Sequence, residues 1–126
     1  LASNQDIEID RYVLLTTPDR FLDRIDDVVK SVGVSQRVAT HLVRRIEREA
    51  SVVAGELNVS DFVKTARVGG ALIIHDKRDS VIPIERARNV AKNWKQGKLV
   101  EIEGTGHFRI LRTKSVIDQT LAFLDS

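Results

Sequence analysis

The run Ala-Leu-Ile-Ile-His at residues 71–75 constrains the fold most, because it is apolar without polar alternation. A strand with one face in water alternates apolar and polar residues, whereas an uninterrupted apolar strand is covered on both faces. Strands covered on both faces occur mainly in parallel sheets that have helices on either side. The run therefore predicts an α/β fold built around a buried parallel strand.

A second strand is predicted to run parallel to the first. A helix is predicted from Pro83, which suits the first turn of a helix, to Trp94, because apolar residues recur at helical spacing between them. The run Lys-Leu-Val-Glu-Ile-Glu at 98–103 predicts the next strand, and its lower apolar content favours a place nearer the sheet edge. A strand–helix–strand crossover is right-handed and leaves its two strands parallel.

The rest of the chain predicts one more strand and several helices. Residues 1–10 are expected to form a frayed lead-in or a short edge segment, and Gly69 and Gly70 to precede the strand at 71–75. The other predicted elements are a strand at 13–15, a helix at 19–31 that begins near Pro18, a helix at 36–51, a short helix capped at Ser60 and a last helix from Thr113. The order is β-α-α-(α)-β-α-β-α, a three-layer α/β sandwich with about three parallel strands.

The composition excludes several classes of protein. The chain of 126 residues has the size of one domain or of a fragment of one, and it contains no cysteine. Disulfides and thiol chemistry are thereby excluded, and a cytoplasmic location is expected. No apolar run approaches the roughly 20 residues that span a bilayer, and no signal peptide is visible. The net charge of +2 does not predict nucleic acid or membrane as a partner.

The most informative pair of residues is Asp79 and His107. Asp79 follows the strand at 71–75, and His107 follows the next strand in the run Glu-Gly-Thr-Gly-His. Loops after parallel strands open at the same sheet edge, so we expect a carboxylate and an imidazole to meet there as an acid–base pair. Gly104 and Gly106 allow the sharp turn that presents His107 at the tip of a loop. Taken alone, each residue also fits a purely structural role. Asp79 would cap the turn, and His107 would be a solvated histidine.

Other polar residues are weaker candidates. Asp76 shares the loop with Asp79 and is an alternative acid. His75 ends a buried strand and is expected to be a packed or hydrogen-bonded core residue, and Trp94 to pack in the core. His41 lies on the basic face of the helix at 36–51, which we interpret as a solvated surface rather than a nucleic-acid site. The three histidines are far apart in sequence, so neither a metal site nor a cofactor is predicted.

Together these residues resemble the C-terminal part of an α/β-hydrolase fold enzyme of the serine esterase, lipase and aminopeptidase type. The family pattern is a strand like Leu-Leu-Ile-His-Gly, then Asp, Val-Pro, a helix, a strand and Gly-x-Gly-His. The matching segments here are LIIHDKRDSVIP, ERARNVAKNW and KLVEIEGTGHFRIL, followed by a terminal helix, and they cover residues 71–125. The resemblance implies a C-terminal β-α-β-α unit at 71–126 and a helical lid or connector at 19–66.

The resemblance also implies roles for the paired residues. The family's triad runs in the order Ser, Asp, His, so Asp79 matches the acid and His107 the base. Asp76 stands where the family commonly has glycine. No Gly-x-Ser-x-Gly elbow occurs in the chain, and none of its serines lies on a strand-to-helix elbow. The absent elbow, together with a chain that begins at Leu1 and has no methionine, favours a fragment.

The expected function follows from this resemblance. The chain would supply the Asp and His of a serine hydrolase that cleaves an ester or amide, and it would be inactive alone. The alternative is a non-catalytic α/β module that binds a partner. In either case the strand at 13–15 would have an unpaired edge, so we expect association with a second copy or with a missing N-terminal half.

Overall fold

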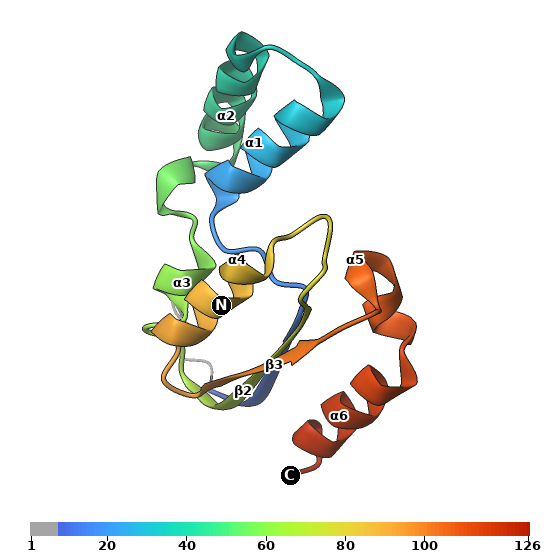
Figure 1. The fold of residues 1–126 in the computed structure, drawn as a ribbon. Helices are drawn as coiled ribbons and strands as arrows, with labels where there is room; N and C mark the ends of the chain where they lie inside the picture. Colours follow the sequence, from blue (N-terminus) through green and yellow to red (C-terminus); the bar gives the residue numbers. More distant parts are fainter. Residues whose placement is uncertain (1–7) are drawn as a thin grey trace. The chain divides into compact units, whose positions relative to one another are not determined.

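The chain divides into two compact units in the computed structural model, which describes residues 8–126. The first unit comprises Leu1–Asp19 and Ser60–Ser126, and the second comprises Arg20–Val59. Figure 1 shows the sheet within the first unit and a pair of helices within the second. The prediction of a lead-in at residues 1–10 falls mostly outside the described residues.

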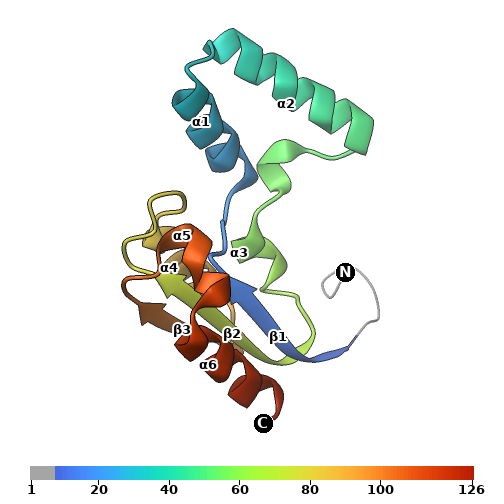
Figure 2. The same cartoon turned by 90° about the vertical axis from the view of Figure 1, so that its right-hand side faces the viewer.

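The first unit is built on a parallel three-stranded sheet. Its strands are β1 (Ile9–Leu15), β2 (Val68–Asp76) and β3 (Gly97–Ile102), in the order β1-β2-β3. Both pairs are parallel, with Tyr12 opposite Ala71 and His75 opposite Glu101. The predicted α/β fold with three parallel strands is therefore confirmed, and Figure 2 shows the three strands side by side.

Helices cover both faces of the sheet, which explains why β2 is apolar without alternation. Leu72 and Ile74 on one face form a buried cluster with Ile110 and Val116, which belongs to α6 (Lys114–Leu124). Ile73 points to the other face, because side chains alternate along a strand, and it is fully buried. That face is covered by α4 (Ile84–Asn93), whose side chains Ile84, Ala87 and Val90 are buried.

An ion pair and an aromatic contact join these elements further. Arg88 of α4 donates to both carboxylate oxygens of Glu101 on β3, at 2.8 Å and 2.9 Å. This bidentate ion pair fixes the orientation of the guanidinium against the planar carboxylate, which the ammonium group of a lysine could not do as well. Trp94 is 3% exposed and meets the ring of Tyr12 edge-on, so its predicted place in the core is confirmed.

The remaining helices are shorter or belong to the second unit. The first unit also contains the helix α5 (Gly106–Arg109) and a 3-10 turn η2 (Ile110–Arg112). The second unit contains α1 (Phe21–Val32), α2 (Gln36–Ala50) and a 3-10 turn η1 (Ala54–Glu56), with Val29 and Ala39 buried. The short helix α3 (Val59–Phe62) begins at the last residue of the second unit.

The structure corrects several predicted boundaries. β1 begins at Ile9, inside the predicted lead-in, and α1 begins at Phe21 rather than near Pro18. β2 begins at Val68, so Gly69 lies within the strand instead of before it. The reason is close backbone contact, because a Cβ atom at Gly69 would lie 2.7 Å from the carbonyl oxygen of Asp10.

The buried carboxylate of Asp19 lies where the chain leaves the first unit, and it is hydrogen-bonded to Ser60, where the chain re-enters that unit. Asp19 is 4% exposed, and its Oδ1 accepts from the backbone N–H of Ser60 at 2.8 Å. Its Oδ2 accepts from Asn89 of α4 at 2.6 Å. The prediction that Ser60 caps the short helix is wrong, because Ser60 lies inside α3 and the carboxylate that accepts its N–H is that of Asp19.

The described residues contain neither a helix long and apolar enough to cross a bilayer nor a group of three metal-ligating side chains.

Candidate active site

Asp79 lies in a tight turn between β2 and α4. Its Oδ1 accepts from the backbone N–H groups of Val81 and Ile82, at 2.8 Å and 2.9 Å. A short carboxylate commonly closes a turn in this way. The capping role that the sequence suggested for Asp79 is therefore real. It occupies only one of the two carboxylate oxygens.

The second oxygen of Asp79 faces His107. Nδ1 of His107 lies 2.9 Å from Oδ2 of Asp79, and since a carboxylate only accepts, Nδ1 carries the hydrogen. The Asp79 side chain is fully buried and that of His107 is 22% exposed. In the described part of the chain no hydrogen bond is found at Nε2 of His107. The imidazole is thus held at one nitrogen and free to exchange a proton at the other.

His107 does not lie at a loop tip, as the sequence predicted, but in the first turn of α5. The two glycines before it explain the sharp approach from β3, because Gly104 has φ +88° and Gly106 has φ +58°. A residue with a Cβ atom resists both angles, although each position has open space around it. The ring of Phe108 meets the imidazole edge-on, with 5.0 Å between ring centres.

Asp76, the alternative acid, is used for a different purpose. It is fully buried, and its Oδ2 accepts from the N–H of Thr105 at 2.6 Å, from the Thr105 hydroxyl at 2.9 Å and from the N–H of Gly106 at 2.8 Å. Its Oδ1 accepts from the N–H of Arg78 at 2.7 Å. The carboxylate therefore holds the loop after β3 against the loop after β2. In doing so it brings His107 within reach of Asp79.

Both carboxylates stay ionised near neutral pH. Burial alone would raise the pKa of Asp79, but the N–H of Ile82, the His107 imidazole and the N–H of Val81 together lower it. Burial likewise opposes ionisation of Asp76, but the hydrogen bonds from Arg78, Gly106 and Thr105 lower its pKa from 3.8 to about 2. An ionised Asp79 is the form that can stabilise a positive imidazole.

The lowered pKa of Asp76 predicts a loss of stability in acid. A carboxyl group with a pKa of about 2 when folded and 3.8 when unfolded adds about 2 kcal/mol to the free energy of unfolding at neutral pH. This contribution is present above a pH of roughly 4 and is lost as the pH falls through about 2. Urea unfolding of the wild type and Asp76→Asn should therefore give a stability difference that shrinks over this range.

The control for this experiment is Asp118→Asn, which changes an exposed carboxylate paired with Lys114. Exposed pairs of this kind contribute about 0.2–1 kcal/mol at most, so this variant should follow the wild type closely at every pH. A difference between wild type and Asp76→Asn that stays constant from neutral pH to pH 2 would contradict the assignment.

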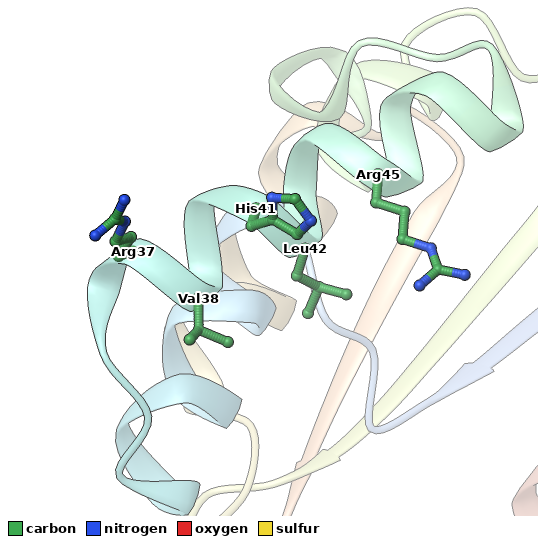
Figure 3. A pocket seen from close by; sticks show the side chains of 5 residues that line it. All are labelled: Arg37, Val38, His41, Leu42 and Arg45. Carbon is green, nitrogen blue, oxygen red and sulfur yellow. The ribbon is translucent and has the colours of Figure 1, made fainter.

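The other two histidines have different surroundings. His75 is fully buried, which confirms the predicted core position, and its Nε2 is hydrogen-bonded to the carbonyl of Ile82. His41 is exposed on α2, where Figure 3 shows it between Arg37 and Arg45 above Val38 and Leu42. These five residues of one helix line a shallow hollow. Among the described residues, those that line the hollow bring no carboxylate or hydroxyl group to the imidazole of His41.

Sequence reasoning missed the residues that hold the pair together. From the sequence, Asp76 was predicted only as an alternative acid. That Thr105 and Gly106 donate hydrogen bonds to it could not be predicted, because they lie 29 and 30 residues further along the chain. The available signal was the position of a carboxylate at the very end of a buried strand. A buried carboxylate must find donors nearby, and in this fold the neighbouring loop supplies them.

Comparisons with solved structures identify the fold. MGS-M2, an α/β hydrolase enzyme from a Medee basin deep-sea metagenome library, matches 99% of this chain with a TM-score of 0.65 and 16% identity. The enol-lactonase from Burkholderia xenovorans LB400 matches 100% of it with a TM-score of 0.62 and 17% identity. A lipase-esterase related protein from Clostridium acetobutylicum matches 90% with a TM-score of 0.57 and 15% identity.

The matches cover only part of the other proteins. The chain spans 59% of MGS-M2, 60% of the enol-lactonase and 56% of the Clostridium protein. At these identities the likeness establishes the fold, and the predicted resemblance to the C-terminal part of an α/β-hydrolase is confirmed at that level. Neither a protein-family model nor a curated protein sequence matches the chain.

Proposed function

We propose, from the α/β-hydrolase fold of this chain, that it supplies the acid and the base of a Ser-His-Asp triad. The enzyme so completed would hydrolyse an ester or an amide by acyl transfer. The serine nucleophile would come from polypeptide outside these 126 residues, because the sequence contains no Gly-x-Ser-x-Gly elbow. No cofactor or metal takes part in this chemistry.

The observation that carries the proposal is the 2.9 Å hydrogen bond between His107 Nδ1 and Asp79 Oδ2. In the proposed mechanism, Nε2 of His107 accepts the proton of the serine hydroxyl as the oxygen attacks the carbonyl carbon. The same nitrogen then returns the proton to the leaving group. Asp79 stabilises the positive imidazole formed between these steps, and its lowered pKa favours the ionised form that this requires.

The edge of the sheet supports association with a nucleophile-bearing part. Among the described residues β1 has a neighbouring strand only on the side of β2. Its other side can pair with a further strand, which would extend the sheet and shield the backbone groups of β1 from water. We propose that this strand belongs to the part of the enzyme that carries the serine, and that a second copy of the chain is the alternative occupant.

A serine-directed fluorophosphonate probe tests the source of the nucleophile. The probe reacts with a hydroxyl that a neighbouring base has activated. We expect it to label the polypeptide that carries the elbow and none of the serines in the 126-residue chain, as located by peptide mass spectrometry. A labelled serine within residues 1–126 would show that the nucleophile lies in this chain. Failure to label the completed protein would count against a serine hydrolase.

A further inference from the structure

His75 is a second imidazole that contacts the turn bearing Asp79. It is the penultimate residue of β2 and fully buried. Its Nε2 lies 2.9 Å from the carbonyl oxygen of Ile82 and 3.6 Å from Oδ2 of Asp79. The oxygen that receives the hydrogen bond from His107 is therefore also approached by the N–H of His75.

The hydrogen bond of His75 defines its tautomer. A carbonyl oxygen only accepts, so the hydrogen lies on Nε2 and, in the neutral imidazole, Nδ1 carries the lone pair. Nδ1 is buried and has no hydrogen-bond partner among the described residues. A buried polar atom without a partner lowers stability. For packing alone, leucine or phenylalanine would therefore serve better at the end of this strand, and the useful part of the side chain is its Nε2–H.

Ile82 connects this donor to Asp79. Its N–H donates to Oδ1 of Asp79, and its carbonyl oxygen accepts from Nε2 of His75. Both polar groups of the residue are thus fixed, one by the carboxylate and the other by the imidazole. The turn from Asp79 to Ile82 is held at its far end by a side chain that is itself anchored in the centre of the sheet. This anchoring limits the rotation of the Asp79 carboxylate away from His107.

We propose that His75 is a positioning residue for the Asp79–His107 pair. Its Nε2–H fixes the carbonyl of Ile82 and lies against Oδ2 of Asp79, so that the carboxylate keeps the orientation in which it accepts from His107. A catalytic role of the pair rests on the proposed function. The contacts of His75 with Ile82 and Asp79 are independent of that function. The charged groups that face His75 are Asp79 and Glu101 of β3, and Glu101 is paired with Arg88.

The proposal is tested by NMR of the 126-residue chain with two substitutions. Glutamine in His75→Gln can place its amide N–H near the position of Nε2, whereas His75→Leu keeps an apolar side chain without a donor. The first readout is the downfield signal of the His107 Nδ1 hydrogen bonded to Asp79. The second is the titration of the Asp79 carboxyl carbon. The matched control is His41→Leu, which removes an exposed imidazole from the second unit.

We expect His75→Leu to lose the downfield signal through exchange with water and to shift the titration of Asp79 to higher pH. His75→Gln should retain the signal and most of the low titration midpoint, and His41→Leu should match the wild type. A side chain that matters only for packing would change stability and leave both readouts unaltered. A folded His75→Leu with an unchanged signal and an unchanged titration would overturn the proposal.

The wild type provides a test that does not depend on folding of the variants. Long-range ¹H–¹⁵N spectra report which nitrogen of each imidazole carries the hydrogen, and the proposal requires Nε2–H for His75 and Nδ1–H for His107. Hydrogen on Nδ1 alone in His75 would overturn the proposal even if His75→Leu failed to fold. Neither measurement uses catalysis, so failure of the hydrolase proposal in an activity assay would remain distinguishable from failure of this one.

Discussion

Replacing His107 by alanine is expected to lower kcat for ester hydrolysis about 10⁴- to 10⁶-fold in the protein that carries the nucleophile. The reason is that the alanine variant has no group to accept the serine proton, since Nε2 of His107 is the atom that the hydrogen bond to Asp79 leaves available. Binding of substrate does not require this proton transfer. KM should therefore change far less than kcat, which is measurable with a p-nitrophenyl ester at neutral pH.

The matched control is His41→Ala, which removes an exposed histidine from α2 and should leave kcat unchanged. In the same assay the 126-residue chain alone should hydrolyse the ester no faster than buffer without protein does. If activity of the completed protein survived His107→Ala, His107 would have no catalytic role. If the chain alone hydrolysed the ester and His107→Ala removed that activity, a nucleophile would lie within these residues.

Replacing Asp79 by asparagine is expected to lower kcat about 10⁴-fold. Asparagine keeps an oxygen that can accept from Val81 and Ile82, so the turn should remain folded. Its amide group cannot stabilise a positive imidazole, and its N–H₂ favours the tautomer of His107 with the hydrogen on Nε2. In that tautomer Nε2 has no lone pair to accept the serine proton. The NMR signal of the Nδ1 hydrogen and kcat should therefore be lost together.

A comparison with the neighbouring acid sharpens this prediction. Asp76→Asn should destabilise the loops, because it replaces an acceptor of four hydrogen bonds, yet the folded fraction should keep much of its kcat. Urea titration gives the folded fraction for each variant at the assay temperature. Full activity in Asp79→Asn together with no activity in folded Asp76→Asn would show that Asp76, and not Asp79, is the acid.

The arrangement of Asp79 and His107 could be predicted because it depends on topology. An apolar run without alternation indicated a strand covered on both faces, and the crossover rule then required the next strand to be parallel to it. Two residues that follow parallel strands must lie at the same sheet edge. The 2.9 Å contact between the two side chains agrees with this expectation, although their catalytic role remains a prediction.

The contacts that hold the pair could not be predicted, because they join groups distant in sequence or depend on the backbone. The donors to Asp76 include the N–H groups of Thr105 and Gly106, and any backbone carries such groups wherever it passes. The short helix that bears His107 has only four residues, too few for periodicity to reveal. The early start of β1 depends on pairing with Val68, and residues 9 and 10 have no strand pattern of their own.

The carboxylate of Asp19 makes residues 20–59 an exchangeable insertion. The backbone N–H of Ser60, where the chain re-enters the first unit, donates to Asp19 at 2.8 Å, and Asn89 donates to the other oxygen of the same carboxylate. Length and composition of the inserted segment can therefore vary without altering the register of β1 against β2. Changes in this segment can thus leave the hydrogen bond between His107 and Asp79 unaltered.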